Sequence, residues 1–187
     1  MKLLYISDRY ALNEYAQPLT FDRYVSMNHG PVLSTTYDLM NGCAIPELQE
    51  QWDNCFEQRQ NHSIKLRENC DLTTTDMIIQ TVDIVWREYS HMSPWSLVEY
   101  THANFEEWTD PKGSSQPIQM HNLLQQLGYD SGEAESIAEG IRSEHPQFNV
   151  LNLARLQRTV HEPVLELSPA DNRETLRKKI LDFANSN

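Results

Sequence analysis

The sequence has few of the features that identify most catalytic or membrane-bound proteins. Its 187 residues include 3 cysteines and 6 glycines, and they contain no C-x-x-C, G-x-G-x-x-G, G-x-x-x-x-G-K or G-x-S-x-G motif. Redox and zinc cysteine pairs, glycine-rich phosphate loops and the nucleophile elbow of hydrolases are therefore missing. No apolar run approaches the roughly 18 residues of a membrane-spanning helix. We predict no catalytic, cofactor-binding or metal-binding residues, and no membrane association.

The few cysteines also bear on the cellular compartment. Cys43, Cys55 and Cys70 are separated by 12 and 15 residues. An odd number of cysteines without framework spacing predicts reduced thiols in a cytosolic protein. The apolar run at the N-terminus is interrupted by Asp8, so it resembles neither a secretory signal nor a membrane span. We expect a cytoplasmic location.

Positive charge is the other scarce feature. The chain has 15 Lys and Arg against 27 Asp and Glu, a net charge of −12. Nucleic acids and anionic membranes attract basic surfaces, so both are disfavoured as partners. The imbalance lies in residues 1–150, which hold 9 basic and 22 acidic side chains, whereas residues 151–187 hold 6 and 5. We therefore divide the chain into a domain over 1–150 and a C-terminal segment over 151–187.

Apolar periodicity predicts a predominantly helical α+β fold. Helices are expected over residues 2–16, 34–40, 74–89, 118–127 and 131–144, together with one opened by Ser93-Pro94, one near 149–158 and one starting at 168. Alternation predicts a small antiparallel β element, with strands near 20–27, 52–57 and 63–67 and the first ending at His29-Gly30-Pro31. In the helix over 74–89, Thr73 with Asp76 resembles a capping box, as does Asp130 with Glu133 for the helix over 131–144. Ser34 is expected to cap the helix over 34–40. The core stripe of the helix over 74–89 is expected to contain Ile78, Val82, Val85 and Tyr89.

The seven histidines show none of the spacings that hold metals, so each is expected to be structural or at the surface. His102 differs because it shares a predicted helix face with Trp95. Residues 118–144 have the layout of a helix–turn–helix, but the second helix carries Glu133, Glu135, Glu139 and Glu144 against Arg142. Such a helix is unsuited to phosphates and base edges, so two packed helices are the favoured interpretation.

The predicted C-terminal helix is amphipathic and locally basic. Its apolar stripe contains Leu176, Ile180 and Phe183, and its other side carries Arg173, Arg177, Lys178 and Lys179. The stripe either packs on the body of the protein or lies in a groove of a partner, because anchors at i, i+4 and i+7 suit both.

Several segments resemble a known family. Residues 2–9 (K-L-L-Y-I-S-D-R), 22–34 with the sequence H-G-P-V, and 37–39 are similar to the Panacea domain of SocA-like proteins, also called phage-associated GepA-like proteins. Residues 72–76 and 95–102, followed by Trp108, look like a second block of that family, so the similarity covers roughly residues 2–145. Scaffold roles are expected for the motif residues Tyr5, Asp8, Arg9, Tyr24, His29, Gly30, Pro31, Trp95 and His102.

The resemblance implies an antitoxin of a type II toxin–antitoxin pair, of the kind associated with prophages. Such a protein neutralises its cognate toxin by direct binding, and toxins of this family include ones that block translation. A proteolytic adaptor that delivers the toxin to a protease, and a DNA-binding autorepressor, are the alternatives. A homodimer and a toxin–antitoxin heterotetramer are the assemblies considered. Residues expected to contact the toxin are Leu176, Ile180, Phe183 and Arg177.

Overall fold

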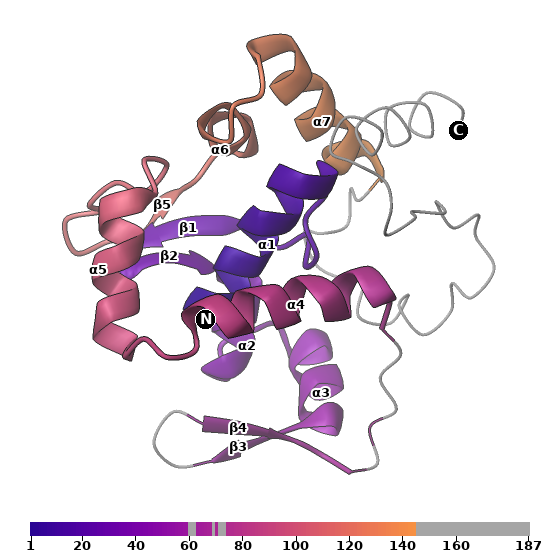
Figure 1. Ribbon diagram of the computed structural model, residues 1–187. Coiled ribbons are helices and arrows are strands. Elements are labelled where there is room, and N and C mark those ends of the chain that lie inside the picture. The colour runs from indigo at the N-terminus through magenta and orange to yellow at the C-terminus, as the bar shows by residue number, and fades with distance from the viewer. Residues whose placement is uncertain (60–62, 69, 71–73, 145–187) are drawn as a thin grey trace.

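The computed structural model describes residues 1–59, 63–68, 70 and 74–144, which form a helical body around a small antiparallel sheet (Figure 1). Helix α1, Lys2–Tyr15, crosses the centre of this body and packs against α4, Asp76–Tyr89. The expectation of a predominantly helical α+β fold is confirmed. Helix α1 ends at Ala16, whose left-handed conformation closes the last turn through a bond from its N–H to the Leu12 carbonyl.

The central sheet begins with a hairpin. Strand β1, Tyr24–Met27, pairs with β2, Gly30–Leu33, and with the short β5, Gln116–Pro117. The predicted strand over 20–27 is therefore four residues too long at its start, because residues 20–23 bond with Asp8 and the first turn of α2 instead of a neighbouring strand. Strand β1 ends at Met27, so the prediction that His29-Gly30-Pro31 ends this strand is confirmed, although Gly30 also opens the return strand β2, which was not predicted.

The second β element lies apart from the first, at the lower edge of the view in Figure 1. Strands β3, Phe56–Arg59, and β4, Ser63–Leu66, pair only with each other in the described part of the chain, so the expected three-stranded sheet with residues 20–27 is wrong. The strand predicted over 52–57 is largely helix, because α3, Pro46–Cys55, continues to Cys55. Leu48 is the buried residue of α3. Leu48 and Trp52 are four positions apart, so the helix places them on one face.

A disulfide closes this hairpin region. Cys55, at the end of α3, is bonded to Cys70, beyond β4, whereas Cys43 is free and exposed. The prediction of three reduced thiols is thus wrong for two of them. The spacing of the cysteines in the sequence does not indicate this disulfide. Residues 55 and 70 lie side by side because the helix changes to a strand at Cys55 and β4 then runs back along β3.

Two further helices follow as expected, with shifts at their ends. Helix α4 begins after Thr75, whose side chain accepts a hydrogen bond from the Ile78 N–H, so the cap lies two residues after Thr73, which falls outside the described residues. Val85 is buried in the predicted stripe, but Val82 is 41% exposed and its assignment to the core is wrong. Helix α5, Pro94–Asn104, starts at the predicted Ser93 cap.

The last described helices are α6, Met120–Gln126, and α7, Ser131–Glu144, which pack on each other. Asp130 and Glu133 form the predicted capping box: the Asp130 carboxylate accepts from the Glu133 N–H, and Glu133 Oε2 accepts from the Asp130 N–H. Short helix α2, Ser34–Met40, is capped by Asp22 and not by the predicted Ser34, because the Asp22 carboxylate accepts the N–H groups of Thr35 and Thr36.

The hydrophobic core joins α1, the central sheet and the four helices α4, α5, α6 and α7. Its fully buried large side chains are Tyr5, Leu12, Leu33, Val85, Leu123 and Leu124. None of the helices in the described ranges is long and apolar enough to cross a membrane. The helices predicted near 149–158 and from 168, and the division at residue 150, lie outside those ranges.

Candidate functional site

Asp8 is the centre of a buried polar network on α1. Its carboxylate accepts hydrogen bonds from the backbone N–H groups of Leu19 and Thr20, each at 2.9 Å, and also from the Thr20 hydroxyl. The Tyr24 hydroxyl donates to the same carboxylate at 3.0 Å. Burial raises the pKa of Asp8 to about 6, although these four bonds act in the opposite direction. Asp8 therefore fixes the loop after α1 and the start of β1 to the helix.

A second buried carboxylate, Glu107, is bound by two other side chains of α1. The Tyr5 hydroxyl and the Arg9 Nε both donate to Glu107 Oε1, each at 2.9 Å. The Arg9 guanidinium also lies 4.4 Å from the centre of the Phe105 ring. Burial, followed by the negative charge of Glu107, raises the pKa of Tyr5 well above its usual value, so its hydroxyl stays a donor. Tyr5 and Arg9 thus attach the segment after α5 to α1.

Gly30 lies where the β1–β2 turn approaches two other elements. Its φ is +94°, and a Cβ at this position would lie 2.6 Å from the Thr101 Oγ1 and 3.0 Å from the Lys2 Nζ. Lys2 donates to the Pro31 carbonyl at 2.8 Å, and burial lowers the pKa of Lys2 to about 8. The backbone therefore needs glycine at position 30 for both its conformation and its packing.

The other aromatic and histidine residues of the motif form two pairs near this turn. The His29 ring meets the Trp95 ring edge-on, with centroids 5.3 Å apart, while His102 stacks on Trp108 at 3.7 Å. Burial lowers the pKa of His102, and the positive charges of Lys2 and His29 add to the shift. Trp95 remains 66% exposed. Trp95 therefore contacts His29. His102, which shares a predicted helix face with Trp95, stacks on Trp108 instead.

The polar side chains of this site hold separate segments of the chain together. Buried carboxylates are candidates for acid–base catalysis, but the Asp8 oxygens already accept four hydrogen bonds and Glu107 is paired with Arg9. Within the described ranges, no three His, Cys, Asp or Glu side chains come together as a metal site. His62, His145 and His161 lie outside those ranges.

A cavity of about 300 Å³ opens beside α1, and no pattern in the sequence indicates it. Its walls come from α1, α4, α5, α6 and the residue after α5, and its lining residues are Ile6, Arg9, Tyr10, Asn13, Tyr89, Tyr100, Phe105, Gln126 and Leu127. The Tyr89 and Tyr100 rings lie 5.2 Å apart with their hydroxyls hydrogen-bonded at 3.1 Å. The cavity is half-open and has four aromatic side chains in its lining, which suits an apolar group entering from solvent.

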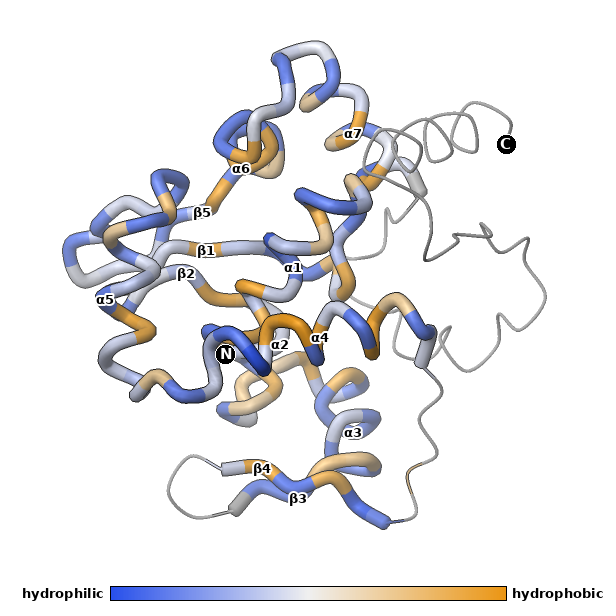
Figure 2. Tube along the Cα trace, viewed as in Figure 1, coloured by the Kyte–Doolittle hydropathy of each residue, from blue (hydrophilic) through white to orange (hydrophobic). Residues whose placement is uncertain are grey.

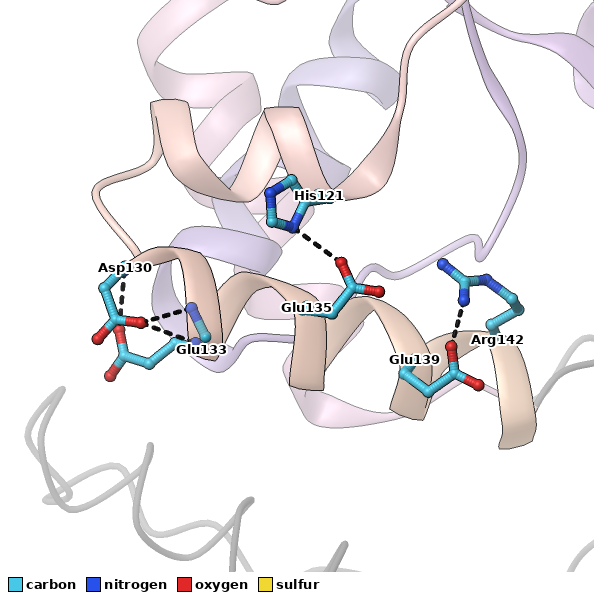
Figure 3. A network of polar contacts seen from close by, with 7 residues as sticks. His121, Asp130, Glu133, Glu135, Glu139 and Arg142 are labelled. Carbon is cyan, nitrogen blue, oxygen red and sulfur yellow. Dashed lines mark hydrogen bonds and ion pairs between the residues drawn. The ribbon is translucent and has the colours of Figure 1, made fainter.

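The α6–α7 pair is the candidate for DNA contact. Figure 3 shows that polar side chains of these helices bond to one another: His121 Nδ1 lies 3.2 Å from Glu135 Oε2, and Arg142 is paired with Glu139. Glu135 and Glu139 are both exposed, with side-chain exposures of 62%. The favoured interpretation as two packed helices agrees with the contact between α6 and α7. An acidic α7 repels phosphates and weighs against a recognition helix.

Sequence reasoning missed several residues of this site. Glu107 and Thr20 are polar partners that meet motif residues from other segments, and Tyr5 and Glu107 are separated by 102 positions. Lys2 lies in the first motif segment, but its bond to Pro31 spans 29 positions. No local spacing signals such a pairing. The predicted toxin contacts Leu176, Arg177, Ile180 and Phe183 lie outside the described residues.

The motif residues fall in a part of the chain that matches a known family. Among models of protein families, the one described as "Antitoxin SocA-like, Panacea domain" matches residues 1–109, which is more than half of the chain. No curated protein and no solved structure matches the chain.

Proposed function

The chain belongs to the SocA-like Panacea antitoxin family, and from this premise we propose that it neutralises a cognate protein toxin by direct binding, as the antitoxin of a type II pair. The observation that carries the proposal is the family match over residues 1–109. That match contains α1, the central hairpin and α4 and α5, together with the Asp8 and Glu107 networks. The partner of an antitoxin is a protein, and the proposed toxin is one that blocks translation.

The motif residues support this function as a scaffold. Tyr5, Asp8, Arg9 and Tyr24 direct their polar groups into the protein, where they hold α1 to its neighbouring loops. A body held together in this way presents a defined surface to a partner, and we propose a binding protein and not an enzyme. Pre-organised surfaces gain affinity because less ordering is required on binding.

The acidic surface supports a basic toxin. Residues 1–150 carry 22 acidic and 9 basic side chains, and complementary charge accelerates association. The basic C-terminal segment, with Leu176, Arg177, Ile180 and Phe183, is proposed as one further toxin contact. We also propose a cytoplasmic location, a prophage origin, and a homodimer or a heterotetramer with the toxin.

Co-expression tests the proposal. The open reading frames beside the gene are expressed singly and then together with this chain, because an antitoxin is encoded next to its toxin. One of them is expected to stop growth alone and to be harmless in the presence of this protein. A toxic neighbour whose effect is unchanged by co-expression would contradict the proposal.

The mode of neutralisation is a separate measurement. Under direct binding, the toxin keeps its cellular half-life while the purified pair forms a stable complex. A toxin that disappears within minutes in the presence of this chain would identify the protease adaptor instead. A mobility shift on its own promoter would identify an autorepressor, and the acidic α7 predicts none.

A full-length variant tests the proposed C-terminal contact. Replacement of Leu176 and Ile180 by Asp removes two apolar anchors and is expected to weaken neutralisation. As a control, thermal unfolding of the same double variant without toxin shows whether the variant is folded. Unchanged neutralisation by a folded variant would exclude this segment from the interface.

A further inference from the structure

Helix α4 carries a row of large apolar side chains that the protein leaves in solvent. Ile79, Val82 and Trp86 are 53%, 41% and 59% exposed, and their spacing of i, i+3 and i+7 places them on one face. We name these three residues the α4 ridge. The buried Thr81 and Val85 lie on the side of α4 that packs against α1, so the ridge is an addition to the core-facing stripe. Figure 2 shows the alternation of hydrophobic and hydrophilic residues along α4.

The ridge leads to the aromatic cavity. Tyr89 follows Trp86 by three positions and Val82 by seven, so it continues the same row, and it forms part of the cavity wall. Three exposed apolar side chains and an adjoining half-open cavity of about 300 Å³ therefore form one surface. Protein interfaces concentrate their binding energy where a large side chain of one partner fills a desolvated pocket of the other.

The charge around this surface defines the partner. Glu14 and Glu88 lie close enough to Tyr10 at the cavity edge to raise its pKa, after the larger effect of burial. On α4 itself, Asp83 comes directly after Val82 and forms an ion pair with Arg87, in which the Asp83 Oδ2 lies 2.7 Å from the Arg87 Nη2. Arg9, the cation in the cavity lining, is already bound to Glu107. Outside these two ion pairs, the charges of the described residues at this rim are Glu14 and Glu88, and they match a partner with Lys or Arg beside its apolar anchor.

We propose that the α4 ridge and the adjoining cavity are the surface that docks the toxin: a basic segment of the toxin lies along Ile79, Val82 and Trp86 and inserts one large apolar side chain between Tyr10, Tyr89 and Tyr100. This inference rests on the proposed antitoxin function and adds to it the binding surface. The exposed apolar area is then buried in the complex, which explains why α4 is apolar well beyond the face that meets α1.

The test compares two tryptophans of similar exposure on different helices. The full chain and its toxin are purified, and the dissociation constant is measured for the wild type, Trp86→Ala and Trp95→Ala. Trp86→Ala is expected to weaken binding about tenfold or more, as for a central anchor. Trp95→Ala is the matched control, 66% exposed against 59% for Trp86, and is expected to stay within about twofold.

A third variant tests the cavity independently of the ridge. Gln126 is exposed and belongs to the cavity lining on α6, so Gln126→Trp fills the space without changing α4 or the core. It is expected to weaken toxin binding by a similar factor, and circular dichroism checks that each variant is folded.

The outcomes separate this proposal from the proposed function. Wild-type chain that neutralises the toxin, together with full affinity in folded Trp86→Ala and Gln126→Trp, overturns the docking surface and leaves the antitoxin function standing. Loss of affinity in Trp95→Ala alone places the interface around α5 and also overturns it. A wild-type chain that neither binds nor neutralises the toxin overturns both.

Discussion

Asp8 shows how one buried side chain holds the family motif together. It is fully buried, and its two oxygens accept four hydrogen bonds from Leu19, Thr20 and Tyr24. A carboxylate with so many donors commonly has a low pKa, but here burial dominates and raises the pKa of Asp8 to about 6. The folded protein therefore binds the Asp8 proton more tightly than the unfolded chain does, in which Asp titrates near a pKa of about 3.9.

This difference predicts an unusual dependence of stability on pH. The stabilising contribution of protonated Asp8 is fully present below about pH 4 and is lost as the pH rises through about 6. The free energy of unfolding of the wild type, minus that of Asp8→Asn, should fall by roughly 2–3 kcal/mol between about pH 4 and pH 7. Urea unfolding at a series of pH values measures it, and Asp8→Asn, which cannot titrate, removes the background from other carboxylates. A difference that stays flat or rises over this range would show that burial does not control the group.

Gly30 offers a second test at a single residue. Gly30→Ala places a methyl group 2.6 Å from the Thr101 Oγ1 and forces alanine to a φ of +94°. Gly128 has a φ of +91°, and a Cβ there would meet nothing within 4 Å, so Gly128→Ala carries the backbone strain without the collision. Urea unfolding is expected to show a loss of about 1 kcal/mol for Gly128→Ala and about 2–4 kcal/mol for Gly30→Ala. Equal losses would mean that Thr101 moves aside freely.

At the scale of elements, the β3–β4 hairpin is separate from the core. Its strands contact α3 and each other, and none of their described residues belongs to the core cluster. The Cys55–Cys70 disulfide is therefore a local constraint on this part of the chain. In a reducing cytoplasm such a bond is expected to be mostly open, so the hairpin is the element that responds to the compartment.

Reduction of the disulfide should loosen the hairpin alone. With dithiothreitol, or in Cys55→Ser, amide hydrogen exchange is expected to accelerate by about tenfold or more in β3 and β4 and to stay unchanged in α1. Cys43→Ser, which removes the free exposed thiol, is the control and should alter neither region. Faster exchange in α1 as well would mean that the bond supports the whole body.

The same elements show what the sequence can predict. Helices α1, α4, α6 and α7 follow from apolar periodicity, because each has one face in a common core. Of their caps, the Asp130–Glu133 box of α7 is the one that neighbouring residues indicate correctly. The strand assigned to residues 52–57 was wrong because Trp52 and Phe56 are aromatic and suit a strand locally, yet they stack at 4.1 Å across a helical turn and its end. The α2 cap failed for another reason: the acceptor, Asp22, lies 13 residues before the N–H that it binds on Thr35.

The candidate site was harder to predict than the fold. Resemblance identified Tyr5, Asp8 and Arg9, but their partner Glu107 and the cavity depend on how α1 meets the segment after α5. The predicted core stripe of α4 indicated that this helix is apolar but not how far its apolar side extends. Periodicity alone does not separate a buried row from an adjoining exposed one, and Val82 falls on the exposed side.

On the scale of the whole molecule, charge and apolar surface are expected to act on different steps of toxin binding. Residues 1–150 carry 22 acidic and 9 basic side chains, and this field attracts a basic partner over distances that salt shortens. The α4 ridge acts only after contact, when Ile79, Val82 and Trp86 leave water. Long-range attraction sets the association rate, whereas desolvated contacts set the dissociation rate.

The two steps are separable by salt and by substitution. Between about 50 and 500 mM NaCl, the association rate constant is expected to fall by roughly tenfold or more while the dissociation rate constant changes little. Trp86→Ala should do the reverse, with faster dissociation and nearly unchanged association. Surface plasmon resonance with the purified toxin measures both constants, and sucrose at matched viscosity is the control for diffusion. An association rate that is independent of salt would show that the acidic body is solvated surface without a role in capture, because steering by charge must weaken as the screening length shortens.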